Sequence, residues 1–261
     1  MPSKMHLTPE LKAAMRRQTV LPHGFPRDES SLTTASAIEH AISILRRHRP
    51  RSWHLILVGA YTGFNFGRGV QAVWAHIDGS GEVDGEGKVR MGAEMREAIV
   101  KCVPFLGIPR VLASLGALQA AQGPDVARRV GALLGPLRDD VRTDAGLMMD
   151  RGRGLWDDIY SPPDLSHKLR RKIATLHPNL DDLIVRSSYG HALSPTGLVG
   201  REDTSALAVT VLRVEEDVLD QLTSHVFGLL KGGGDQAYVQ AIIDVVDGLR
   251  AGVLGDRPAK L

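Results

Sequence analysis

The sequence predicts an all-α protein, and three features of the chain support this prediction. Apolar residues recur at helical spacing in most segments, and prolines and glycines separate these segments. The one run that resembles a strand, at 53–58, continues without any hairpin signal. With 261 residues, 43% of them hydrophobic, the chain is long enough to bury a substantial core in one large domain or two compact ones.

Charge and cysteine content exclude several classes of protein. The 32 Lys and Arg residues are balanced by 30 Asp and Glu residues, so no general attraction to nucleic acid or to an anionic membrane is expected. The single cysteine, Cys102, excludes an internal disulfide, a CxxC pair and a zinc site of several thiolates, which favours an intracellular protein. No apolar run approaches the ~20 residues that a membrane-spanning helix requires, so no membrane span is predicted.

The first part of the chain is predicted to form helices joined by a loop. Apolar residues share one face of 31–48, a helix that Pro50 terminates. The run at 53–58 and its Gly- and Ala-rich continuation to residue 77 are predicted to form a buried helix that packs closely against its neighbours. The glycine-rich stretch 78–87 is interpreted as a solvated linker. A calcium loop is the alternative, but the acidic residues do not follow the order of calcium ligands.

The middle of the chain is predicted to be helical up to a long connection. Met95 and Cys102 fall on one helical face, and Pro104 and Pro109 break the helix. Cys102 is therefore expected in the core, where its thiol would be an inert small hydrophobe. The charged, glycine-rich stretch 138–154 is predicted to link two domains or to form a long surface connection. These domains are predicted to cover residues 1–150 and 151–261.

The second half is predicted to consist of further helices. Helix 179–193 is expected to begin at Asn179 as its N-cap and to end at Gly190. Two helical runs with an acidic break between them occupy 197–234, and the last helix covers 235–249. The buried stripe of the last helix is predicted to be Val239, Ile242, Ile243 and Val246.

His225 is the first candidate for a chemical role. An imidazole exchanges protons near neutral pH, and this one is embedded among apolar residues. The alternative is a histidine buried at a packing face. No HxH, HExxH or paired cysteine spacing is present, so neither a metal site nor a cofactor is predicted.

Several motifs around His225 resemble one known family. They are Leu176-His177-Pro178-Asn179-Leu180, Tyr189-Gly190, Gly197-Leu198, and Gln221-Leu222-x-x-His225 with the glycines at 228 and 232–234. Together, over about 151–250, they resemble the carboxymuconolactone decarboxylase family and its alkylhydroperoxidase AhpD-like relatives. A fainter copy at 94–109 places His76 as the counterpart of His225. The resemblance implies a tandem helical fold, a homo-oligomer and an active site around His225.

The chain also departs from this family. Val218 and Gln221 occupy the positions of the redox branch's two cysteines, which excludes disulfide exchange at this site. The lactone decarboxylase branch carries an Arg-Glu pair, for which Glu202 and Asp203 are the nearest substitutes. The predicted catalytic residues are therefore His225 as acid or base, with Glu202 or Asp203 as its carboxylate partner.

Stabilisation of a developing enolate is predicted to come from Tyr189, Arg201 or Arg186. Such a site would decarboxylate, isomerise or hydrate a small carboxylated or acyl substrate. A non-catalytic binding or assembly protein on the same scaffold is the alternative, and a thiol-dependent peroxidase is a weaker one.

The chain ends in Ala259-Lys260-Leu261, which resembles the peroxisomal SKL-type signal. Such a tripeptide is read by an import receptor through its free carboxylate and basic side chain. The sequence therefore predicts a peroxisomal protein with that receptor as a partner. The cytoplasm is the second choice, and a mitochondrial presequence is only weakly indicated.

Overall fold

The computed structural model describes residues 6–17, 34–215 and 217–255, and these residues form helices with no strand among them. The prediction of an all-α fold is therefore confirmed. The helices of the first half are α1 (Pro9–Arg16), α2 (Thr34–Leu45), α3 (Trp53–Gly63), α4 (Gly67–Gly79), α5 (Gly85–Lys101), α6 (Val103–Leu106), α7 (Ile108–Leu134), the 3-10 helix η1 (Gly135–Arg138) and α8 (Asp139–Arg142). Those of the second half are α9 (Ala145–Ile159), α10 (Pro163–Leu176), α11 (Leu180–Asp182), the π-helix η2 (Leu183–Leu193), α12 (Arg201–Val214), α13 (Leu219–Lys231) and α14 (Gln236–Gly255).

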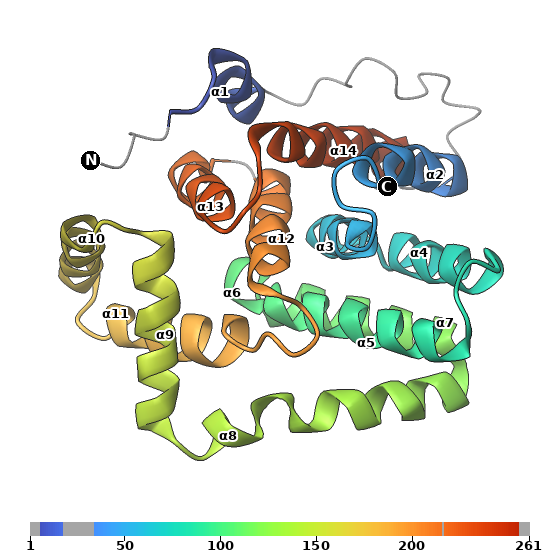
Figure 1. Cartoon of the computed structure of the whole chain (residues 1–261), viewed down its shortest axis with the longest axis horizontal. Coiled ribbons are helices and arrows are strands. Elements are labelled where there is room, and N and C mark those ends of the chain that lie inside the picture. Colours follow the sequence, from blue (N-terminus) through green and yellow to red (C-terminus); the bar gives the residue numbers. More distant parts are fainter. Residues whose placement is uncertain (1–5, 18–33, 216, 256–261) are drawn as a thin grey trace, which may run out of the picture.

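Helix α12 lies at the centre of the molecule (Figure 1). It packs against α3, α13 and α14, and α3 packs in turn against α4 and α5. On one side of α12, α9 crosses and packs against η2, with α10 and α11 beside them (Figure 1). Helix α2 covers α14, so the elements around α12 come from both halves of the chain.

The main hydrophobic core extends from Leu7 to Val253 along the sequence. It includes the predicted stripe of α14, which is fully buried and is therefore confirmed. Burying one Val or Ile side chain is worth about 1.5–3 kcal/mol, so this stripe fixes α14 firmly. Both predicted domains contribute side chains to this core, and the boundary near residue 150 stays a prediction.

The segment 53–77 forms two helices rather than one, which corrects the prediction. The chain leaves α3 at Phe64 and turns at Asn65, whose φ of 52° is left-handed and incompatible with a continuing helix. Close packing was predicted correctly. At Gly59 and Gly63 of α3, an added Cβ would collide with Leu207 and Val214 of α12, so only glycine allows the two helices to approach.

The stretch 138–154 is also not the predicted linker, because it forms η1, α8 and most of α9. One of its glycines, Gly152, allows close contact between two helices. A Cβ at Gly152 would collide with the carbonyl of Val185, and one at Gly190 would collide with the carbonyl of Met148. Gly190 therefore lies inside η2 at the α9–η2 contact and does not end the helix, and Asn179 makes no side-chain capping bond.

Other predicted breaks hold. The loop within 78–87 is shorter than predicted, since α4 ends at Gly79 and α5 begins at Gly85, where Asp84 caps α5 by accepting from the Gly87 amide at 2.7 Å. Gly107, with φ 75°, separates α6 from α7. Cys102 is fully buried in the main core, as predicted.

A buried ionic network fixes the end of η2. Lys101, which has no exposed surface, donates to the carbonyls of Leu193 at 2.5 Å and Pro195 at 2.7 Å. Its burial lowers the pKa of the ammonium to about 8, against the nearby charge of Glu97. Glu97 is held in turn by both terminal nitrogens of Arg138, at 2.7 and 2.8 Å. This network orients the segment that leads into α12.

Candidate functional site

His225, the predicted catalytic residue, lies in α13 with an exposed fraction of 4%. Its ring meets Phe105 edge-on at 5.3 Å between centroids and Tyr160 at 6.3 Å. Its Nδ1 has no hydrogen-bond partner among the described residues. Burial lowers the pKa of the imidazole to about 4, because removal from water penalises the charged form. His225 is therefore neutral at pH 7.

Tyr189 belongs to the same surroundings. Its hydroxyl lies 3.0 Å from that of Tyr160, and its ring meets Trp156 edge-on at 5.0 Å. Burial raises the pKa of both tyrosines, so both hydroxyls stay protonated. We call this group the aromatic centre. Its members are Phe105, Trp156, Tyr160, Tyr189 and His225.

Glu202 and Asp203, the predicted carboxylate partners, meet other residues at the start of α12. Glu202 accepts from Arg49 Nε at 2.6 Å, and Arg49 also donates to the carbonyl of Gly233 at 3.1 Å. Asp203 is hydrogen-bonded to Ser52. Burial raises the pKa of Asp203, and the bond from Ser52 opposes that change. Both carboxylates stand in the first turn, where the helix dipole favours negative charge.

His54 of α3 is the residue that connects this region to α5. It is 1% exposed, and its Nε2 lies 3.0 Å from Oε2 of Glu94. Glu94 also accepts from Arg90 at 2.9 Å, so its carboxylate lies between Arg90 and His54. The other nitrogen, Nδ1, is buried and without a hydrogen-bond partner in the part of the chain that the structure describes. A carboxylate thus orients an imidazole whose second nitrogen has no partner among the described residues.

Tyr238 of α14 completes this region. Its hydroxyl is buried with no hydrogen-bond partner among the described residues, and Arg49 lies over its ring at 5.3 Å. Burial and the charge of Asp203 raise the pKa of this hydroxyl. The charges of His54 and Glu94 also act on Asp203. We call this group the polar centre. Its members are Arg49, Ser52, His54, Glu94, Glu202, Asp203 and Tyr238.

The four predicted catalytic residues are therefore found at two places. Tyr189 and His225 share the aromatic centre through Tyr160, whereas Glu202 and Asp203 belong to the polar centre. Among the described residues, the rings that contact His225 are those of Phe105 and Tyr160. The predicted cationic donors are engaged elsewhere, Arg201 with Asp158 and Arg186 with Asp182.

Neither His76 nor Cys102 has surroundings that favour chemistry. His76 is half-buried against the edge of Trp53, at 5.7 Å between ring centroids, unlike the enclosed His225. Burial raises the pKa of the Cys102 thiol, so the reactive thiolate is disfavoured. Within the described ranges, no group of three His, Cys, Asp or Glu side chains is arranged to hold a metal ion.

Comparison with known proteins gives one informative similarity. The chain is 26% identical over 151 residues to the protein named Peroxisomal protein 2 of Schizosaccharomyces pombe. The similarity covers 57% of this chain and 64% of the relative, so the chain spans less than two thirds of that protein's length. No family model and no solved structure matches the chain. No helix in 6–17, 34–215 or 217–255 is long and apolar enough to cross a membrane.

Sequence reasoning missed the members of the polar centre that lie in the first half of the chain. His54 is the only charged or polar side chain within the apolar run 53–58, which is the signal that could have identified it. Its partner Glu94 is 40 residues away, so the pair appears only after folding. Tyr238 was not identified as a candidate, because it lies directly before the apolar stripe of α14 and resembles part of the core.

Proposed function

We propose that this chain is a peroxisomal protein on a tandem carboxymuconolactone decarboxylase-like scaffold, and that it carries out acid–base chemistry at the polar centre. The name of the fission yeast relative supports the peroxisomal location. The C-terminal tripeptide Ala259-Lys260-Leu261, which lies outside the described residues, supports it independently.

The packing of α12 supports the tandem scaffold. Helix α12 packs on the two helices that follow it, α13 and α14, and α3 packs on the two helices α4 and α5 in the same way. Helices α3 and α12 also pack on each other, with Gly59 against Leu207. Two similar groups of three helices joined through their first members are what duplication of one module would produce.

The observation that carries the chemical proposal is the pair of His54 and Glu94. Nδ1 of His54 removes a proton from a carbon next to a carbonyl or carboxyl group, and Glu94 stabilises the imidazolium that forms. The hydroxyl of Tyr238 donates to the enolate oxygen, and the proton returns from His54 to the same or a neighbouring carbon. The step moves one proton and needs no oxidant. The substrate class follows from the family resemblance, which implies a small carboxylated or acyl compound.

Exchange of α-protons in D₂O tests this proposal with 4-oxopentanoate as the probe, followed by ¹H NMR with the full chain. We expect the wild-type chain to accelerate exchange and His54→Gln to lower the rate about 100-fold or more, which is the usual contribution of a general base. Glu94→Gln is expected to lower the rate less, and His225→Gln to leave it nearly unchanged. Loss of exchange in the His225 variant would move the chemistry back to the aromatic centre.

A non-catalytic binding or assembly protein is the second candidate, and the enclosure of His225 by Phe105 and Tyr160 favours it. Exchange by the wild-type chain no faster than in buffer would overturn the acid–base proposal in favour of this one. A thiol peroxidase is disfavoured, since Cys102 is the single cysteine and burial raises its pKa.

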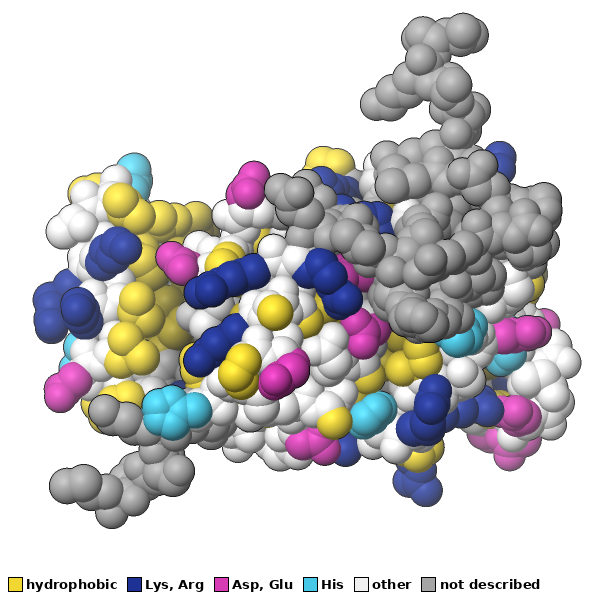
Figure 2. Space-filling model, turned by 90° about the horizontal axis from the view of Figure 1, so that it is seen from above, with side chains coloured by type: hydrophobic (Ala, Val, Ile, Leu, Met, Phe, Trp, Pro, Cys, Tyr) yellow, Lys and Arg dark blue, Asp and Glu magenta, His cyan; other side chains and the backbone are white. Residues whose placement is uncertain are grey.

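Oligomerisation stays a prediction, and exposed apolar side chains support it. Leu165 and Leu176 of α10 are 43% and 72% exposed, and Leu183 of η2 is 57% exposed. Hydrophobic side chains form a strip at the end of the molecule where α10 lies (Figure 2). A second copy of the chain would remove such a strip from water.

A further inference from the structure

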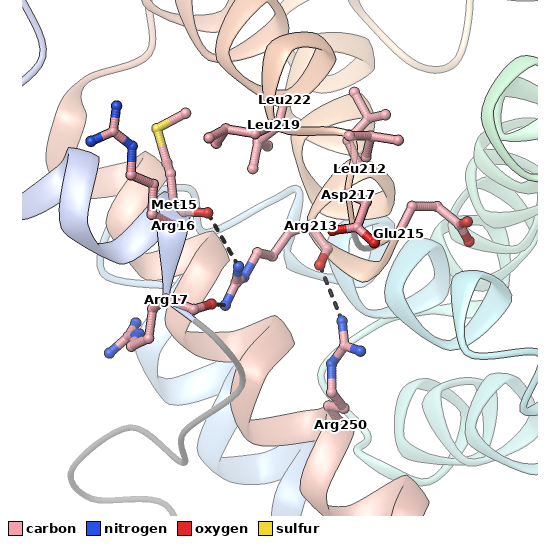
Figure 3. A pocket seen from close by; sticks show the side chains of 11 residues that line it. Met15, Arg16, Arg17, Leu212, Arg213, Glu215, Asp217, Leu219, Leu222 and Arg250 are labelled. Carbon is pink, nitrogen blue, oxygen red and sulfur yellow. Dashed lines mark hydrogen bonds between the residues drawn. The ribbon is translucent and has the colours of Figure 1, made fainter.

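A cavity of about 470 Å³ opens at the opposite end of α12 from the polar centre (Figure 3). Asp203 stands in the first turn of α12 and Arg213 in its last turn, about 15 Å apart along the helix. The cavity is therefore separate from the polar centre. Its lining comes from the ends of α1, α12 and α14 and from the start of α13. Arg250 of α14 and Asp217, just before α13, are among its lining residues.

One side of the cavity is apolar. Leu212, Leu219 and Leu222 lie together on one side of Arg213, and Met15 faces them from α1 (Figure 3). Leu219 is 37% exposed, so part of this apolar wall is in contact with water. The volume lies within the ~300–1,000 Å³ of small-molecule sites, so an apolar chain fits along this wall.

The other side is cationic. Four arginines line the cavity, and two of them are fixed from behind: Arg213 by Asp247 at 2.7 and 2.8 Å, and Arg17 by Asp244 at 2.8 Å. The Nε of Arg17 is buried and has no hydrogen-bond partner among the described residues. The side chain of Arg17 points away from Leu219 and Leu222 (Figure 3), so Arg17 contributes positive charge to this side of the cavity rather than a contact at the start of α13.

The acidic side chains of the lining offset this charge only in part. Glu215 is paired with Arg110, which does not line the cavity. Asp217 is exposed at the edge, where its backbone is left-handed with φ 63°. Arg16 at the end of α1 is exposed on the same rim.

The start of α13 adds a second anion-attracting feature. Val218 is its N-cap and supplies no side-chain capping bond, so the first amides of this 13-residue helix have no side-chain acceptor. Val218 and Leu219 both line the cavity, so the positive end of the helix dipole lies at its wall.

We propose that this cavity binds a monocarboxylate with an unbranched apolar chain. The carboxylate meets the first amides of α13 on the side of Arg16, and the chain lies along Leu212 and Leu222. A small inorganic anion would leave the apolar wall uncovered, and a neutral chain would leave the first amides of α13 without an acceptor. This binding goes beyond the acid–base function and does not depend on it.

Isothermal titration of the full chain with decanoate tests the proposal, with decanol and acetate as matched ligands. Decanoate is expected to bind at least about tenfold more tightly than either, a difference of about 1.4 kcal/mol. Leu219→Glu places a negative charge at the cavity, yet it suits the first turn of α13, so the fold is kept. We expect it to weaken decanoate binding about tenfold or more. Asp217→Asn removes a carboxylate at a left-handed position that Asn tolerates, and it should tighten binding about two- to fivefold.

Three results would overturn the proposal: no saturable binding of decanoate, equal binding of decanol and decanoate, or unchanged affinity in a folded Leu219→Glu variant. Thermal unfolding by circular dichroism verifies that each variant is folded. Proton exchange with 4-oxopentanoate distinguishes this failure from that of the acid–base function, because Leu219→Glu lies outside the polar centre and leaves the exchange rate unchanged.

Discussion

Protonation of His225 is predicted to destabilise the folded chain in acid. The imidazole is enclosed by Phe105 and Tyr160, and its pKa falls from 6.5 in water to about 4 in the fold. Between these two pH values, His225 binds a proton in the unfolded chain but not in the folded chain. The contribution of His225 to stability is therefore complete above pH 6.5, decreases as the pH falls from 6.5 towards 4, and is absent below 4.

The magnitude follows from the same two values. Each unit of difference in pKa between the folded and unfolded states is worth about 1.4 kcal/mol, so His225 alone accounts for about 3 kcal/mol. Domains are stable by only about 5–15 kcal/mol in total, so this loss is large enough to measure.

His225→Phe isolates this contribution, because Phe suits an aromatic centre and does not titrate. Urea unfolding followed by circular dichroism at pH 7, 5.5 and 4 gives the free energy of unfolding for both proteins. The difference between variant and wild type cancels the other titrating groups and should change by about 3 kcal/mol in favour of the variant between pH 7 and 4. A difference independent of pH would refute the reasoning, since it would mean that His225 stays protonated or hydrated in the fold.

Two further predictions concern packing and location. Gly152→Ala would push α9 away from the carbonyl of Val185 and is expected to lower the free energy of unfolding by about 3 kcal/mol, whereas Gly154→Ala in the same helix meets open space and should raise it by about 0.5–1 kcal/mol. Equal effects in urea unfolding would contradict the close contact of α9 and η2. Removing 259–261 from a fusion with an N-terminal fluorescent protein should move it from peroxisomes to the cytosol, and unchanged peroxisomal fluorescence would exclude the tripeptide as the signal.

Periodicity predicted the helical character of most of this chain but not the roles of its glycines. The stripe from Val239 to Val246 could be predicted because a buried helix face requires apolar residues at helical spacing, and this spacing is visible in the sequence. Gly152 and Gly190 could not, because a glycine in a linker, at a helix end and at a helix contact looks the same in the sequence. Only the carbonyls of Met148 and Val185, which come from the partner helices, distinguish these roles.

The candidate site was harder to predict, because the family motif identifies residues along one segment while the surroundings of each residue come from distant ones. Helices α12 and α13 are consecutive, which made a pairing of His225 with Glu202 or Asp203 the natural hypothesis. The first turn of α12 instead meets Arg49 and Ser52, which precede α3. His225 meets α6 and α9 through Phe105 and Tyr160.

The polar centre therefore depends on how the two halves of the chain meet. The carboxylates at the start of α12 come from the second half of the chain, and the imidazole with its orienting carboxylate, His54 and Glu94, comes from the first. The close approach of α3 and α12 at Gly59 is what brings them together. A sequence motif that lies within one half of the chain contains no information about this contact between the two halves. If the acid–base proposal holds, separating the two modules would abolish proton exchange even where each still folds, because neither half holds the whole polar centre.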